Sequence, residues 1–146
     1  MIQDFLEVNK LDGKIISFPS DTTIEKAVES THLSAGSVAK VAVFFDEKMD
    51  FFIVIAPKDH VVLVKEANEL FKKKTLEVAG EEETKNLSGF EKKFFPPISV
   101  FGTTVAMHPI LKNKPKLVFA LGYREFLVIT PKAIMDAAEV CDAFEE

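Results

Sequence analysis

The sequence predicts one domain of the mixed α/β (α+β) class, in which a mixed or antiparallel sheet has helices packed on its outside. The main observation is that apolar runs of strand length alternate with segments whose apolar residues recur at helical spacing. The chain has 146 residues, 47% of them hydrophobic and 28% charged, as expected for a folded domain of ordinary size. No repeat or Gly/Ser linker divides it, so the domain is expected to span residues 1–146.

The first predicted elements are a short strand and a helix. The strand is KIISF, which begins at Lys14 and has the apolar, extended character of a sheet segment. The helix is expected from about Thr23 to Thr31, because Thr22 and Glu25 have the spacing of a capping box. One face of this helix is apolar and carries Ile24, Ala27 and Val28.

The middle of the chain predicts a hairpin followed by two helices. Two apolar runs, AKVAVFF and FFIVIA, are separated by DEKMD, which is typical of a β-hairpin with a charged turn. A helix is expected from about Val64, with an apolar face made by Val64, Ala67, Leu70 and Phe71. TLEVA then returns to a strand, and GEEETKNLSG predicts a short acidic helix that Gly89 ends.

Residues 90–102, FEKKFFPPISVFG, are expected to form a shaped loop or an edge segment. Pro96 and Pro97 have no N–H and a fixed φ, so they exclude a helix interior and a central strand. Beyond this loop TTVAM, KLVFALG and EFLVIT predict strands, with Gly122 and Tyr123 at the turn between the last two. Pro131 is expected to begin a final helix.

The composition limits the classes of partner. A formal net charge of −5 argues against a broad electrostatic grip on nucleic acid, although lysine clusters at 72–74, 92–93 and 112–116 leave a local patch open. No apolar run reaches the ~18 residues of a membrane helix, and the first residues, MIQDFLEVNK, lack the basic region of a secretory signal. We therefore expect a cytoplasmic protein. The single Cys141 cannot form an internal disulfide, and no spaced His/Cys set indicates a zinc site.

Lys40 needs an explanation, because its ammonium group lies at the start of the apolar run AKVAVFF. Strand alternation places Lys40, Ala42 and Phe44 on one side and Val41, Val43 and Phe45 on the other. The small Ala42 leaves space beside the lysine, as in the wall of a pocket. Alternatively, Lys40 extends along an apolar stem into water at the strand end. The pattern alone leaves both interpretations open.

Two further groups are open to a functional or a structural interpretation. His60 follows Asp59 at a strand-to-helix corner, where a structural role is expected. Tyr123 and Arg124 could contact a bound RNA end by stacking and by binding a phosphate. Alternatively, they could form an ordinary surface turn.

The chain resembles the YbaK / aminoacyl-tRNA editing domain family, which includes the prolyl-tRNA-synthetase-associated deacylases. The segments that carry the resemblance are, in order, TTIEKAVE, AGSVAKVAVFF, IAPKDHVVLVKEANEL, NLSGFEKKFFPPISVFG and ALGYREFLVITPKAI. Together they span the chain from about Ile16 to Ala138. The resemblance implies a barrel-like mixed sheet surrounded by helices, with a pocket for the aminoacylated 3′ end of a tRNA.

The implied activity is that of a free-standing aminoacyl-tRNA deacylase. Such an enzyme hydrolyses the ester of a mischarged tRNA, above all a proline tRNA bearing the wrong amino acid. The resemblance implies no cofactor and no metal, and water or a group of the substrate is expected to attack the carbonyl. The expected partner is the 3′ acceptor end of aminoacyl-tRNA, with an aminoacyl-tRNA synthetase as an open second partner, and with no membrane and no DNA.

The resemblance also assigns site residues. The family's lysine falls on Lys40, as the catalytic residue, and the substrate-binding positions are Pro97, Ile98, Ser99, Gly102 and Gly122. The chain departs from the family at Pro96 and Pro97, which replace glycines, and at Val41, which replaces Thr, Ser or Asn. The segment LGYRE also lacks a histidine found in some alanine-specific members. Because proline offers no N–H donor, the alternative is an inactive tRNA- or synthetase-binding module.

Overall fold

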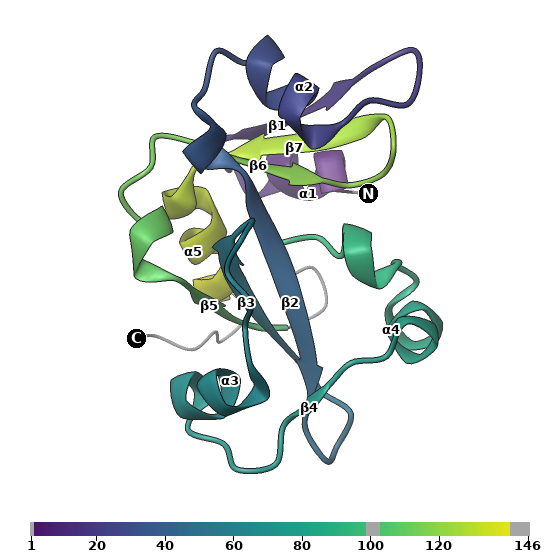
Figure 1. The fold of residues 1–146 in the computed structure, drawn as a ribbon, viewed down its shortest axis with the longest axis vertical. Helices are drawn as coiled ribbons and strands as arrows, with labels where there is room; N and C mark the ends of the chain where they lie inside the picture. The colour runs from purple at the N-terminus through teal and green to yellow at the C-terminus, as the bar shows by residue number, and fades with distance from the viewer. Residues whose placement is uncertain (1, 99–102, 141–146) are drawn as a thin grey trace.

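The computed structural model describes residues 2–98 and 103–140, and Figure 1 shows the order of their helices and strands. The α-helices are α1 (Ile2–Val8), α2 (Ile24–Ser30), α3 (Val64–Phe71), α4 (Glu81–Ser88) and α5 (Pro131–Val140). The strands are β1 (Gly13–Ser17), β2 (Ala39–Phe45), β3 (Phe51–Pro57), β4 (Glu77–Val78), β5 (Thr104–Met107), β6 (Leu117–Ala120) and β7 (Glu125–Ile129). Short 3₁₀ helices are η1 (Ala35–Ser37), η2 (Lys92–Phe94) and η3 (Pro109–Leu111).

The strands form two sheets. One is three-stranded and antiparallel, in the order β1-β7-β6, and the other is four-stranded, in the order β4-β2-β3-β5. In the second sheet β2 pairs antiparallel with both β3 and β4, whereas β3 and β5 are parallel. The mixed α/β class is therefore confirmed, as are the hairpin β2–β3 and the turn between β6 and β7.

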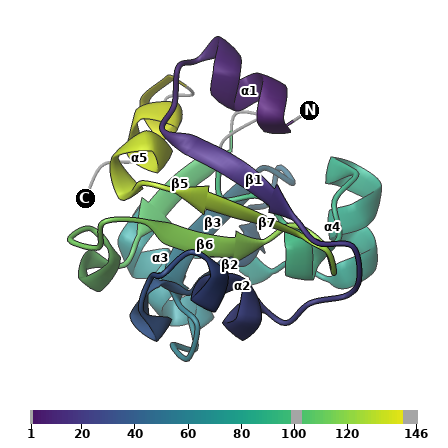
Figure 2. The ribbon, with the colours of Figure 1, turned by 90° about the horizontal axis from the view of Figure 1, so that it is seen from above.

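The expectation of one barrel-like sheet is wrong, because the sheet does not close. In the described part of the chain, a single parallel bridge between Val38 and Val118 joins the two sheets. After this bridge β2 runs away from β6 and pairs with β3 and β4 instead (Figure 1). Figure 2 shows the three-stranded sheet lying across the end of β2 and β3. A pocket lined by residues of β2 and β6 lies where the two strands diverge.

The two faces of β2 pack into different apolar clusters, which confirms the predicted alternation. Val43 and Phe45 belong to the main core, which is shared by the two sheets, α1 and α5. Phe44 belongs to a smaller core under α3, against which Ala42 also packs. Lys40 begins the row that faces this smaller core, at the end of the strand nearest to the three-stranded sheet.

Two details near the N-terminus differ from the sequence prediction. Thr23, not Thr22, caps α2, because its side chain accepts a hydrogen bond from the Lys26 amide at 3.2 Å. The Thr22 hydroxyl instead donates to the carbonyl of Ser20. Helix α1, a short helix whose Leu6 is 1% exposed in the main core, was not expected from the sequence.

None of the described helices is both long enough and apolar enough to traverse a membrane.

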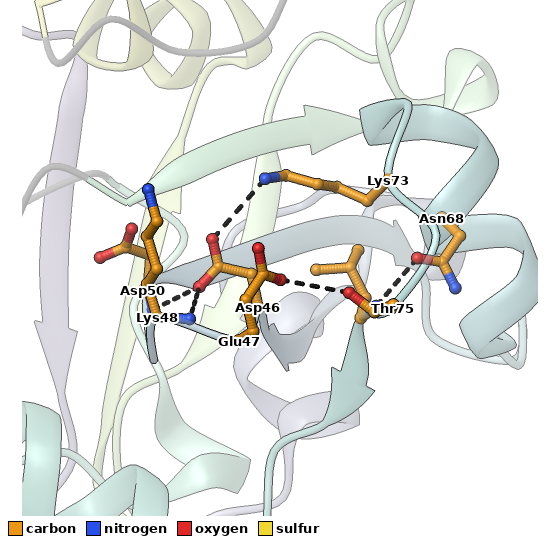
Figure 3. A network of polar contacts seen from close by, with 8 residues as sticks. Asp46, Glu47, Lys48, Asp50, Asn68, Lys73 and Thr75 are labelled. Carbon is orange, nitrogen blue, oxygen red and sulfur yellow. Dashed lines mark hydrogen bonds and ion pairs between the residues drawn. The ribbon is translucent and has the colours of Figure 1, made fainter.

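A buried carboxylate organises the β2–β3 turn. Asp46, 6% exposed, accepts hydrogen bonds from the amides of Lys48 and Asp50 at 2.9 Å each. Its second oxygen lies 3.7 Å from the ammonium of Lys73, which follows α3 (Figure 3). The aspartate thus joins the hairpin turn to the end of α3, and the charged turn is a structural feature.

Asp46→Ala is expected to lower the free energy of unfolding by about 2 kcal/mol, because two amide donors and Lys73 lose a charged acceptor. Urea denaturation followed by circular dichroism measures the change. The matched control is Asp46→Asn, which keeps an oxygen acceptor for the amides and loses only the charge, so its loss should be smaller. An unchanged unfolding midpoint in Asp46→Ala would contradict this account of the turn.

Candidate functional site

A pocket of about 300 Å³ opens where β2 diverges from β6, and we call it the Lys40 pocket. Its apolar walls come from α2, β2, β6 and the segment after η2, and are made by Ile24, Val38, Ala39, Val41, Phe95, Phe119 and Ala120. The charged residues in its lining are three lysines, Lys40, Lys58 and Lys93. The volume is at the lower end of the range typical of small-molecule sites, so the pocket suits one small chemical group.

Lys40 is the second residue of β2 and is among the residues that line this pocket. Lys40 is half-buried, and its predicted catalytic role stays a prediction. It also borders a second hollow of about 230 Å³, whose lining includes Val61 and Val78. No hydrogen bond or ion pair joins its ammonium to another described residue.

The other two lysines are held by partners at the pocket rim. Lys58, one residue beyond β3, forms an ion pair with Glu25 of α2. The hydrogen bond between them raises the pKa of Lys58 and lowers the pKa of Glu25. Lys93 of η2 donates a hydrogen bond to the hydroxyl of Tyr123, which raises the pKa of Lys93. Both groups are thus cationic at neutral pH, and the pocket favours a ligand that carries negative charge.

The aminoacyl-tRNA editing domain family model matches residues 19–137. The chain belongs to this family. The matched residues include every element that lines the Lys40 pocket, from α2 to β6. No curated protein matches the sequence.

Solved structures show the same fold as this editing domain. A crystal structure of hypothetical protein APE2540 has a TM-score of 0.79 at 18% identity, covering 94% of this chain and 93% of that one. The crystal structure of a candidate trans-editing enzyme for prolyl tRNA synthetase has a TM-score of 0.77 at 23% identity, covering 94% of this chain and 89% of that one. The TM-scores establish a shared fold, and at these sequence identities the similarity shows the fold alone.

Of the predicted site residues that the structure describes, Lys40 alone is among those that line the pocket. Phe95, directly before the two prolines, lines the same pocket as Lys40, so the loop begins at the pocket wall. Pro96 and Pro97 are buried, and the Ile98 side chain, 1% exposed, packs into the main core. None of these three residues is among those that line the pocket. Ser99 and Gly102 lie outside the described residues.

Gly122 is separated from the pocket wall. It lies in the β6–β7 turn, two residues beyond the wall residue Ala120, and a Cβ built on it would meet no atom within 4 Å. Its predicted role in substrate binding stays a prediction. The sequence analysis did not single out Lys58, and it noted Lys93 only as part of a charged cluster. Lys58 directly follows an apolar strand, and Lys93 directly precedes two phenylalanines. Both patterns are too common in proteins to identify a site.

Two of the three histidines, His60 and His108, lie together outside the Lys40 pocket. His60 Nε2 lies 3.0 Å from a carboxylate oxygen of Glu66, and the rings of His60 and His108 are 4.8 Å apart. His108 therefore has an aromatic neighbour in His60. Among the described residues, no group of three or more His, Cys, Asp or Glu side chains is placed to hold a metal ion.

Proposed function

We propose that this editing domain is a free-standing deacylase that hydrolyses the ester of mischarged aminoacyl-tRNA. Membership of the aminoacyl-tRNA editing domain family supports this class of substrate. The observation that carries the proposal is that Lys40 lines a pocket for one small group, and that its ammonium has no partner among the described residues. A charged donor that is free in the unliganded protein can bind the acylated end without first breaking a bond within the protein.

In the proposed reaction, water attacks the carbonyl carbon of the ester, and the bond from that carbon to the ribose oxygen breaks. The products are the free amino acid and a tRNA hydroxyl, which takes up the proton that the water loses. The role of Lys40 is to orient the ester and to offset the negative charge of the tetrahedral oxyanion. None of the described residues that line the pocket is a carboxylate or an imidazole. The base is therefore assigned to a second water or to a group of the substrate.

The apolar wall of the pocket favours an amino acid whose side chain is small and uncharged. Isoleucine, valine, phenylalanine and alanine side chains form most of the wall, and the volume of about 300 Å³ must also hold the ester. The lysines suit the ribose and phosphate of the RNA end. Similarity in fold to a candidate trans-editing enzyme for prolyl tRNA synthetase supports a proline tRNA bearing a wrong, small amino acid.

The test is hydrolysis of a panel of aminoacyl-tRNAs by the wild-type protein. The panel contains proline tRNA charged with alanine, serine or cysteine, and correctly charged proline, alanine and lysine tRNAs as controls. We expect rapid release of one small amino acid from proline tRNA, and at least tenfold slower release from the correctly charged controls. Release no faster than in buffer across the whole panel would contradict the proposal.

The second candidate function is a binding module that has kept the pocket and lost the reaction. Two observations favour it. Pro96 and Pro97 have no N–H groups to donate beside the pocket, and Val41 lines the wall with methyl groups alone. Measurable binding of proline tRNA or of a synthetase, without hydrolysis of any member of the panel, would support this candidate over the deacylase.

A further inference from the structure

The β6–β7 turn carries an exposed aromatic side chain beside the Lys40 pocket. Tyr123 is 57% exposed, and it is the sole aromatic residue among the large exposed apolar side chains of the described chain. Its ring lies 5.1 Å from the ring of Phe94 at an interplanar angle of 86°. In Figures 1 and 2 the β6–β7 turn and the region of η2 lie next to each other. The protein thus exposes one ring at the point where these two segments meet.

Part of the Tyr123 ring is open to a ligand. The residue is 57% exposed although it pairs edge to face with Phe94, and the Lys93 ammonium lies 4.8 Å from its ring centroid. The ammonium of Lys93 is hydrogen-bonded to the Tyr123 hydroxyl, which lies at the rim of the ring. A flat apolar group can therefore lie against Tyr123 with a cation close to its edge.

The backbone of this turn is held in place. The carbonyl of Tyr123 accepts a hydrogen bond from the Thr22 amide, and the carbonyl of Arg124 accepts one from the Phe18 amide, both at 2.9 Å. The Arg124 side chain donates to Asp21, also at 2.9 Å. These bonds tie the turn to the segment between β1 and α2. A ligand that stacks on Tyr123 therefore needs little ordering of the protein.

Lys93 connects the ring to the pocket. It lines the Lys40 pocket and is also bonded to Tyr123, so ring and pocket are adjacent on one surface. An aminoacyl ester in the pocket is attached to a ribose, and this ribose carries a base within the length of one nucleotide. Aromatic side chains next to cations are the usual platform for unpaired bases.

We propose that Tyr123, with Phe94 behind it and Lys93 at its edge, is a stacking platform for the terminal base of an RNA 3′ end. The proposal rests on the proposed function, because it assumes that the ester enters the Lys40 pocket. Its own content is a binding site for a nucleobase, outside the pocket that holds the amino acid. The alternative is a contact that only stabilises the turn against η2.

The composition of the chain offers a direct readout. Tyr123 is the single tyrosine and there is no tryptophan, so tyrosine emission reports on this ring alone. We would titrate the protein with an uncharged tRNA acceptor minihelix ending in CCA, and with the same minihelix lacking the terminal base. Saturable quenching by the first RNA and not by the second is expected, after correction for absorption by the RNA. Equal emission changes with both RNAs, or none with either, would overturn the proposal.

Affinity measured by the anisotropy of a labelled minihelix gives a second readout. Tyr123→Ala should weaken binding of the intact minihelix about tenfold and leave binding of the abasic one unchanged. Tyr123→Phe is the matched control, since it keeps the ring and should bind within about twofold of wild type. An equal loss for both RNAs in Tyr123→Ala would mean a structural role and overturn the proposal. If Tyr123→Ala does not fold, Tyr123→Leu tests the same point.

This experiment is independent of hydrolysis, because the minihelix carries no amino acid. Base-dependent quenching without deacylation of any charged tRNA would support the stacking platform and contradict the deacylase function. Deacylation without base-dependent quenching would support the deacylase function and contradict the stacking platform.

Discussion

Lys40→Ala is expected to lower kcat/KM for deacylation by about 10²- to 10³-fold, the range seen when one oxyanion-stabilising donor is removed. The expected cause is the loss of the cation that orients the ester and offsets the oxyanion charge. Folding should be unaffected, because Lys40 is half-buried and its ammonium has no partner among the described residues. Initial rates with mischarged proline tRNA, together with the thermal unfolding midpoint, measure both effects.

Two variants control this experiment. Lys116→Ala removes a lysine that is also half-buried, directly before β6, but that does not line the pocket, and its activity should stay within about twofold of wild type. Lys40→Arg keeps the charge in a planar, larger group, and its activity should be little higher than that of Lys40→Ala. Unchanged turnover in Lys40→Ala would remove Lys40 from the mechanism, and equal losses in Lys40→Ala and Lys116→Ala would indicate a general effect of charge.

Phe44→Ala is expected to lower the free energy of unfolding by about 3–5 kcal/mol, a large share of the ~5–15 kcal/mol typical of a whole domain. Phe44 is 1% exposed, in the smaller core that packs β2 and β3 against α3. Phe52, Phe71 and Leu76 surround it there and cannot fill the space that its ring would leave. Chemical denaturation, with the slope checked against wild type, measures the loss.

The matched controls for Phe44 separate burial from apolar character. Leu63→Ala removes a large apolar side chain that is 63% exposed, and the loss should be below about 0.5 kcal/mol. Phe44→Leu keeps most of the volume and should cost less than Phe44→Ala. Equal losses in Phe44→Ala and Leu63→Ala would contradict the placement of Phe44 in this core.

The local elements were predictable because each has a signal within a few residues. The alternating apolar runs around DEKMD correctly predicted β2 and β3, and Gly89, with φ of 81°, ends α4 as expected. The capping prediction was wrong, because Thr23 rather than its neighbour Thr22 caps α2, and the sequence pattern did not indicate α1. In α1 only Ile2 and Leu6 are buried, so its apolar face is too short to be distinguished from a loop.

The predicted site was only partly accessible to sequence reasoning. Lys40 was identified because an ammonium among apolar residues is unusual in a strand, and because the family resemblance placed a lysine there. Lys58 and Lys93 look like ordinary surface lysines until the fold brings them to the same pocket. Ile98, in contrast, was expected at the substrate and has its side chain in the core, because sequence does not show which atoms of a loop residue face inward.

By itself, the sequence determined the class of fold, the faces of β2 and the lysine at its start, since these follow from residue types at fixed local spacing. Only the tertiary structure decided that the strands form two sheets rather than a barrel, and that a pocket opens between them. It also decided that Tyr123 lies beside Lys93, 30 residues earlier in the chain. Such juxtapositions depend on how far each strand pairs before it diverges, and long-range pairing leaves no mark in the local pattern.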